Sequence, residues 1–217
     1  MFPSKLSPDD EIRVIAPSAS FANIVSSTRD TAVENLSALG LRLSYGENCQ
    51  EIDEFRSSSI ASRIADIHDA FADPRVKGIL SVIGGYNSNQ LLRYLDYDLI
   101  AANPKALCGF SDITALGTAI YAKTGLVTYS GPHFSTFGMK KGLEYTLEYF
   151  KKCLMETIPF VVEPSSEWSD DSWYRDQENR SFIANEGYRV VNEGQAEGRL
   201  LGGNLCTLNL LQGTEYM

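Results

Sequence analysis

The chain of 217 residues is 43% hydrophobic and carries a net charge of −9, which suits one large or two small globular domains. The acidic balance disfavours a nucleic-acid polymer as a partner, because binding to phosphates requires clustered lysine and arginine. No apolar run approaches the roughly 20 residues of a membrane span, and the N-terminus lacks the apolar core of a secretory signal, so neither a membrane partner nor secretion is expected.

Short apolar runs alternate with amphipathic segments over the first 130 residues. The expected strands are 13–16, 41–45, 78–83, 106–108 and 127–129, and the expected helices are 28–39, 59–72, one that starts at 90, and 112–123. The segment Gly78–Ile83 is apolar at nearly every position, as in a strand that is covered on both faces. Because strands that alternate with helices form parallel sheets, the sequence predicts an α/β domain with a doubly wound, mostly parallel sheet.

The composition changes after a further expected helix at about 141–155. Residues 163–197 hold nine acidic residues and three arginines, together with both tryptophans of the chain, Trp168 and Trp173. We interpret this stretch as a solvated crossover between two domains that its aromatic residues partly order. A plain polar linker explains it equally well.

The last residues predict the beginning of another unit. Residues Gly198–Leu205 look like a strand that turns into a helix, and little chain follows before Met217. The expected division is therefore an N-terminal α/β domain over 1–155, an acidic crossover over 156–197, and the start of a truncated C-terminal domain over 198–217.

The cysteines give no sign of a metal or redox site. Four of them lie 45 to 59 residues apart, and none forms a C-x-x-C pair: Cys49, Cys108, Cys153 and Cys206. Dinucleotide, P-loop and zincin motifs are absent as well. We therefore predict no metal and no cofactor, and we interpret the cysteines as free thiols in a reducing cytoplasm.

The segment Cys108–Thr114, with the sequence Cys-Gly-Phe-Ser-Asp-Ile-Thr, has the strongest chemical signal. A short apolar strand ends there in a glycine, and a helix follows, so Ser111 is expected on a sharp turn with its hydroxyl exposed. A serine in that place can act as a nucleophile, and the helix amides behind it can stabilise an oxyanion. The usual motif is G-x-S-x-G, whose last glycine is Ile113 here. The alternative is that Ser111 or Asp112 simply caps the helix.

A glycine pair, Gly84-Gly85, follows the previous predicted strand. Loops at the carboxyl ends of strands form the ligand crevice of a doubly wound sheet, so this pair and Ser111 are expected at the same edge. The amides of Gly85 and Asp112 would then form an oxyanion hole. A tight turn that needs a positive φ explains the pair equally well.

The two histidines of the chain are weak candidates for a general base. His68 lies on an amphipathic helix, and we expect it at the surface. His133 follows a predicted strand within Ser-Gly-Pro-His, and we expect it to be a loop or substrate-contacting residue rather than the base that a serine nucleophile requires.

Four runs together resemble the LD-carboxypeptidase family of serine peptidases, and within it the branch of microcin C self-immunity peptidases. The resemblance extends from about residue 5 to the end of the chain, and its motifs are Ile83–Leu92, Asn103–Leu116, Ser130–Pro132 and Gly198–Leu205.

The resemblance implies a fold, a site and an activity. An N-terminal α/β domain would carry the nucleophile, Ser111, with the amides of Gly85 and Asp112 as oxyanion donors, and a C-terminal domain would carry the glutamate and histidine of a Ser-Glu-His triad. The residues expected to contact substrate are Gly84, Tyr86, Asn87, His133, Trp168 and Trp173. Family members are cytoplasmic homodimers without a metal. They cleave an amide bond near a free carboxylate, either in murein tetrapeptides or between a peptide and a modified nucleotide.

Two departures from the family pattern affect the expected function. Ile83 stands where the muropeptide branch usually has an arginine, which together with the tryptophan-bearing insert favours the immunity branch. Trp168 or Trp173 would then stack on a nucleobase or pack at a domain interface. The triad glutamate and histidine would lie beyond Met217, since neither Glu215 nor His133 falls at their positions.

Three functions therefore remain open from the sequence. The first is a serine carboxypeptidase that cleaves a small peptidyl-nucleotide, with the full gene product longer than this chain. The second is a muropeptide carboxypeptidase for wall recycling. The third is an inactive truncated fragment that acts as a binding module, because loss of the base would lower serine-dependent turnover by orders of magnitude.

Overall fold

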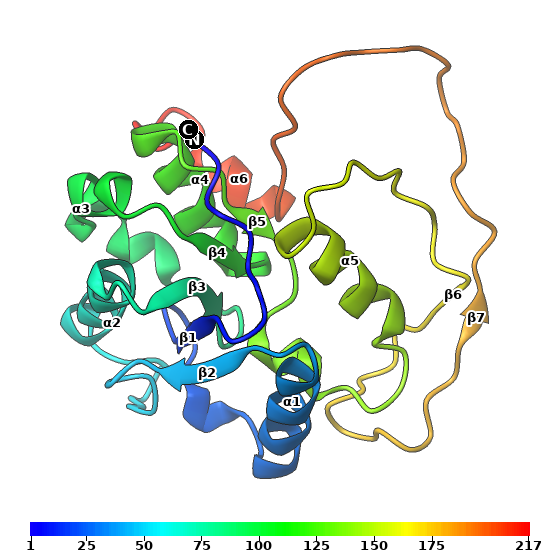
Figure 1. The fold of residues 1–217 in the computed structure, drawn as a ribbon, viewed down its shortest axis with the longest axis horizontal. Coiled ribbons are helices and arrows are strands. Elements are labelled where there is room, and N and C mark those ends of the chain that lie inside the picture. The colour runs from blue at the N-terminus through cyan, green and yellow to red at the C-terminus, as the bar shows by residue number, and fades with distance from the viewer.

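The computed structural model describes residues 1–217 and is built around one five-stranded sheet (Figure 1). The strands follow the order β2-β1-β3-β4-β5, and all four neighbouring pairs are parallel. Their bounds are β1 Glu11–Ile15, β2 Arg42–Tyr45, β3 Val76–Ser81, β4 Ala106–Gly109 and β5 Tyr129–Ser130. The prediction of a doubly wound, parallel α/β sheet is confirmed.

The strand order reverses between β1 and β3. From β1 the chain crosses outward to β2, then returns to β3 on the other side of β1 and continues outward to β4 and β5. The loops that leave the carboxyl ends of β1 and β3 therefore turn away from each other, and such a switch point is where open α/β sheets bind ligands.

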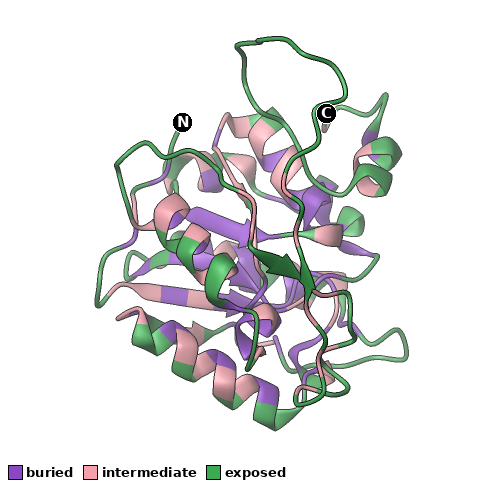
Figure 2. Cartoon of the chain, turned by 90° about the vertical axis from the view of Figure 1, so that its right-hand side faces the viewer, coloured by how far each residue is buried: buried purple, intermediate pink, exposed green.

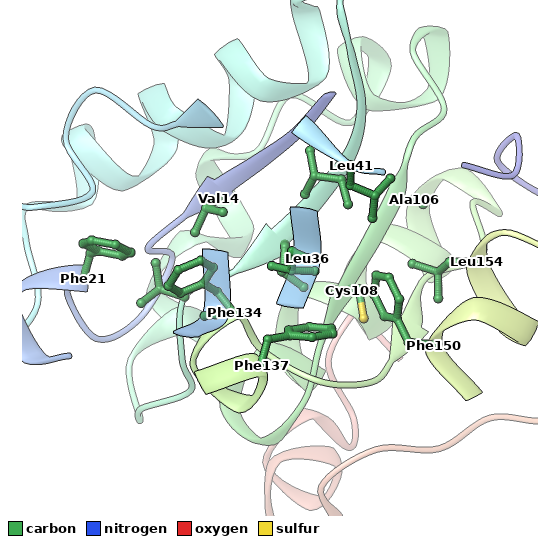
Figure 3. Packing of buried hydrophobic residues seen from close by; sticks show 14 of the residues in the cluster. Val14, Phe21, Leu36, Leu41, Ala106, Cys108, Phe134, Phe137, Phe150 and Leu154 are labelled. Atoms are coloured by element: carbon green, nitrogen blue, oxygen red, sulfur yellow. The ribbon is translucent and has the colours of Figure 1, made fainter. Parts of the chain in front are cut away.

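One face of the sheet is covered by α1 (Ser26–Ala38), the 3₁₀ helix η4 (Phe134–Gly138) and α5 (Glu144–Leu154). Figure 3 shows the side chains of Leu36, Phe134 and Phe137 against the strand residues Val14 and Cys108. Such burial of apolar surface is the dominant favourable contribution to folding. The short 3₁₀ helix η1 (Phe21–Asn23) closes one end of this layer.

Five elements cover the opposite face: α2 (Ile60–Ala72), η2 (Ser88–Tyr94), α3 (Tyr97–Ala102), α4 (Thr114–Thr124) and α6 (Leu205–Leu211). They form a second core with the other side chains of the same strands, such as Ile79 and Leu107. Figure 2 shows the buried strands enclosed between helices that are exposed on their outer sides. Burial on both faces explains why these strands read as continuous apolar runs.

Two local expectations differ from the structure, and one short helix was not expected. The helix expected to start at 90 is the 3₁₀ helix η2, and α3 was not predicted because its six residues are too few to show a helical period. The strand expected within 198–205 is absent, and residues 198–204 are exposed. A strand needs a neighbour for its backbone hydrogen bonds, and no strand lies beside this segment.

The acidic stretch holds little regular structure. Only β6 (Glu167–Trp168) and β7 (Ile183–Ala184) form there, as a short antiparallel pair that lies beyond α5 in Figure 1. Further along, α6 packs on α4 and buries Leu211 in the second core. No helix has the length and the apolar character that crossing a membrane requires. The division of the chain into domains stays a prediction.

Candidate active site

Ser111 occupies a strained turn between β4 and α4. It begins the 3₁₀ helix η3 (Ser111–Ile113), and its φ of +61° lies in the left-handed region, which serine rarely adopts. Such conformations persist only where the surrounding structure enforces them, and they gather at functional sites. The N-cap residue is Phe110 for η3 and Ile113 for α4, and no side chain caps either helix. The alternative that Ser111 or Asp112 is a helix cap is therefore wrong.

The glycine pair lies directly against this serine. A Cβ at Gly84 would be 3.0 Å from Ser111 Cβ and 3.2 Å from Ser111 Oγ. Gly85 has a φ of +157°, and a Cβ on it would be 2.1 Å from Ser18 Oγ. Both the positive φ and the close approach require glycine. The structure thus brings the two loops together at the carboxyl edge of the sheet, as the sequence predicted.

The two backbone amides predicted to be oxyanion donors belong to the loops that meet at Ser111. Asp112 lies in the first turn of η3, ahead of the first helical hydrogen bond, which the Ile113 amide donates to the Phe110 carbonyl over 3.2 Å. Amides in a first helical turn have no partner within the helix. Gly85 lies in a loop outside any helix or strand. Backbone donors of this kind are what stabilises an oxyanion.

The side chain of Asp112 has a role that the sequence did not reveal. It is buried, and its Oδ2 accepts hydrogen bonds from Ser18 Oγ (2.6 Å), the Asn87 amide (3.0 Å) and the Ser88 amide (2.9 Å). The partners lie in the loops that follow β1 and β3, far away in sequence. No local motif could have indicated them.

His133 is buried behind the turn, with 3% of its surface exposed. Its ring stacks on Phe110 at 3.9 Å between centroids, and its Nε2 lies 2.8 Å from the Phe110 carbonyl oxygen. Burial lowers the pKa of His133 to about 4, although the carbonyl contact acts in the opposite direction. His133 is therefore neutral near pH 7, and its Nε2–H donates to Phe110. It supports the backbone that precedes Ser111.

Stability is expected to depend on the protonation of His133. Because its pKa in the folded state is depressed from 6.5 to about 4, the stability it contributes is present above about pH 6.5 and is lost as the pH falls towards 4, by up to about 3 kcal/mol. Urea unfolding at about pH 7 and about pH 4.5 should show a smaller pH effect in His133→Gln than in the wild type. His68→Gln is the matched control, because it removes a histidine without touching the Phe110 carbonyl. Equal pH effects in wild type and His133→Gln would contradict this prediction.

The remaining predicted site residues divide into two groups. Tyr86 and Asn87 lie beside the glycine pair. Tyr86 is 69% exposed and donates its hydroxyl hydrogen to the Phe55 carbonyl (2.8 Å), whereas Asn87 is buried with its Oδ1 3.1 Å from Ser18 Oγ. Trp168 and Trp173 belong to the acidic stretch, which Figure 1 shows beyond α5 and away from the end of β4. Their contact with a ligand stays a prediction.

His68, expected at the surface, is partly buried, and its Nε2 accepts a hydrogen bond from the Asp96 amide (2.9 Å).

Histidine, cysteine and carboxylate side chains form no group of three that would hold a metal ion. A left-handed serine between a parallel strand and a helix, with a glycine loop against it, is typical of α/β serine hydrolases. Residues 12–131 match the family model of the LD-carboxypeptidase N-terminal domain. The chain belongs to the LD-carboxypeptidase family.

Individual relatives show the same relationship over the whole chain. The YocD protein of Bacillus subtilis (strain 168) is 60% identical over 216 residues, which are 100% of this chain and 66% of that protein. A probable murein peptide carboxypeptidase of the same organism is 32% identical over 215 residues, 99% of this chain and 60% of that protein. The chain thus spans about two thirds of the length of the curated relatives it matches.

Solved structures agree with this assignment. The crystal structure of an MccF-like protein from Bacillus anthracis str. Ames has a TM-score of 0.99 and 61% identity, over 100% of this chain and 66% of that one. The microcin C7 self-immunity protein MccF in complex with aspartyl sulfamoyl adenosine has a TM-score of 0.90 and 35% identity, over 100% of this chain and 67% of that one.

Proposed function

We propose that the whole protein is a serine carboxypeptidase in which Ser111 attacks an amide carbonyl near a free carboxylate. The observation that supports this most is the left-handed φ of +61° at Ser111, directly against Gly84. Holding serine in that conformation costs stability, and such strain is typically retained where function requires it. The family membership agrees with the proposal.

The reaction would take two steps. Ser111 Oγ bonds to the carbonyl carbon, and the amides of Gly85 and Asp112 donate hydrogen bonds to the oxyanion that forms. The C–N bond then breaks, the amine leaves with a proton, and an acyl-serine remains. Water attacks this ester, releases the acid and returns the proton to Oγ. Because the Nε2 of His133 faces the Phe110 carbonyl, we assign the general base to residues outside 1–217, as the family resemblance implies.

The substrate class we favour is a small peptidyl-nucleotide, cleaved as in self-immunity to a microcin C-like compound. MccF, whose structure is known with aspartyl sulfamoyl adenosine, supports this class through its fold similarity over all of the present chain. Ile83 in place of the arginine of the muropeptide branch points in the same direction. Trp168 or Trp173 would stack on the nucleobase. A cytoplasmic homodimer stays a prediction from the resemblance.

A second candidate is a muropeptide carboxypeptidase. The observation that favours it is the 32% identity to a probable murein peptide carboxypeptidase over almost the whole chain. Both candidates use the same serine and the same oxyanion donors, so they differ only in what binds beside the scissile bond.

The experiment compares the two substrates on protein expressed from the whole reading frame. We expect kcat/KM for aspartyl sulfamoyl adenosine to exceed that for a murein tetrapeptide by at least about 10-fold, because contacts to the nucleotide that are realised in the transition state favour the first substrate. Product formation by liquid chromatography and mass spectrometry measures both rates. The reverse preference would assign the protein to wall recycling, and hydrolysis of neither substrate would contradict the proposed function.

A further inference from the structure

We propose that the Asp112 carboxylate is a positioning residue that holds the Gly85 amide in place relative to the Ser111 hydroxyl. The inference rests on the proposed function and extends it, because it gives the side chain of Asp112 a task separate from that of its backbone amide. Its basis is a hydrogen-bonded unit that joins three loops at the carboxyl edge of the sheet.

The unit is centred on one oxygen atom. Asp112 Oδ2 accepts from Ser18 Oγ, the Asn87 amide and the Ser88 amide at 2.6, 3.0 and 2.9 Å, and Asp112 is only 7% exposed. Hydrogen bonds to an ionised acceptor are shorter and stronger than neutral ones. The Asp112 backbone also takes part, since its carbonyl accepts from Ser88 Oγ over 2.7 Å. The loop after β3 is therefore tied to the turn after β4 through the amides of Asn87 and Ser88 and through the Ser88 hydroxyl.

Ser18 connects the unit to the glycine pair. Ser18 Oγ lies so close to Gly85 that a Cβ added to this glycine would be only 2.1 Å from it. The Ala19 amide donates a hydrogen bond to the Gly84 carbonyl over 3.2 Å. Asp112 thus fixes Ser18, and Ser18 packs directly on the backbone of Gly85. A displacement of the Asp112 carboxylate would therefore displace Ser18, and with it the Gly85 amide.

Arg63 binds the loops after β1 and β3 through their backbone carbonyl groups. Its side chain is buried, and Nη1 donates to the Pro17 carbonyl (3.3 Å) and to the Asn87 carbonyl (3.1 Å). Arg63 thus holds the carbonyl of Asn87 and Asp112 holds its amide, which restrains the end of the Gly84-to-Asn87 loop. Oxyanion donors are effective because they are held in place before charge develops, and these buried bonds provide that restraint.

Asp112 is adjacent to Ser111 in the sequence, so its hydrogen bonds also affect the position of the nucleophile. Asp112 follows Ser111 directly, so the same residue that receives the three hydrogen bonds also limits where the Ser111 Cα can lie. The nucleophile and the Gly85 amide therefore belong to one unit, although they come from different strands. The groups that contact substrate keep their catalytic geometry only when neighbouring residues hold them in position.

The test compares two variants at Asp112 in protein from the whole reading frame. Asp112→Asn keeps one acceptor without the charge, and Asp112→Ala removes it. We expect kcat to fall about 10-fold in the first and about 100-fold in the second, with KM changed by no more than about twofold. If Asp112→Ala does not fold, Asp112→Asn alone still tests the inference.

A binding measurement separates positioning from a general structural role. In the inactive Ser111→Ala background, adding Asp112→Asn should leave the Kd for aspartyl sulfamoyl adenosine within about twofold by calorimetry. Asp66→Asn is the matched control, because Asp66 is likewise buried and accepts from the Asn48 amide (3.1 Å) and Asn48 Nδ2 (2.9 Å) in a different loop. It removes the charge of a buried carboxylate in the same way and should leave kcat unchanged.

Two results would overturn the inference: an unchanged kcat in both Asp112 variants, or a loss in kcat that only follows the loss of folded protein. Its failure is distinguishable from failure of the proposed function. If Ser111→Ala is inactive while both Asp112 variants keep wild-type kcat, only the positioning role of Asp112 is rejected. If Ser111→Ala retains activity, the proposed function itself is rejected.

Discussion

Replacing Ser111 with alanine is expected to lower kcat of the whole protein by at least about 10⁴-fold, because no other group in the turn can form the acyl intermediate. Substrate binding should persist, since the variant removes only the hydroxyl that bonds to the carbonyl carbon. Hydrolysis of aspartyl sulfamoyl adenosine, or of the murein tetrapeptide if that is the preferred substrate, measures the change. Ser37→Ala, at an exposed position on α1, is the control and should have full activity.

A companion variant connects the strain at this residue to its function. Ser111→Gly should be as inactive as the alanine variant, yet more stable than the wild type by about 1 kcal/mol, because glycine adopts a φ of +61° without the steric cost that serine bears. Urea unfolding measures the difference. Residual activity near wild type in either variant would reject Ser111 as the nucleophile, and a less stable glycine variant would show that the turn is not strained.

Replacing Gly85 with alanine is expected to have the next largest effect. The new Cβ would lie 2.1 Å from Ser18 Oγ and 3.1 Å from the Ala19 nitrogen, on a backbone whose φ of +157° disfavours any side chain. The loop must shift, and the Gly85 amide moves with it. We expect kcat to fall about 10²- to 10³-fold, as when an oxyanion donor is removed, together with a loss of about 1–3 kcal/mol in unfolding free energy.

The control for this variant is Gly125→Ala. Gly125 ends α4 with a φ of +71°, and a Cβ there would meet no atom within 4 Å. This variant has only the conformational cost of a positive φ, which lowers the unfolding free energy by about 1 kcal/mol. Because there is no clash, it should retain full kcat. If Gly85→Ala loses only as much stability as Gly125→Ala and keeps its kcat, the Gly85 amide has no part in catalysis.

Local patterns in the sequence were sufficient for much of the fold. The strands around Ile79 and Leu107 could be predicted because burial on both faces leaves an apolar run, and α2 because its apolar residues recur at helical spacing. The 3₁₀ helix η2 and the short helix α3 could not be specified, since a few residues contain too little periodicity. The prediction of a strand before α6 was wrong, because a strand forms only beside another strand, and sequence spacing does not reveal whether one is present.

The sequence by itself determined the strand-turn-helix around Ser111, because glycine, serine and the following helix signal occur within seven residues. It also placed Gly84 and Gly85 at the same edge, since the carboxyl ends of parallel strands share an edge. Only the tertiary structure decided that the Asp112 carboxylate binds Ser18, 94 residues away, and that the His133 ring donates to the Phe110 carbonyl. The physical reason is that a buried polar group must find a hydrogen-bond partner, and which partner it meets depends on how distant loops pack.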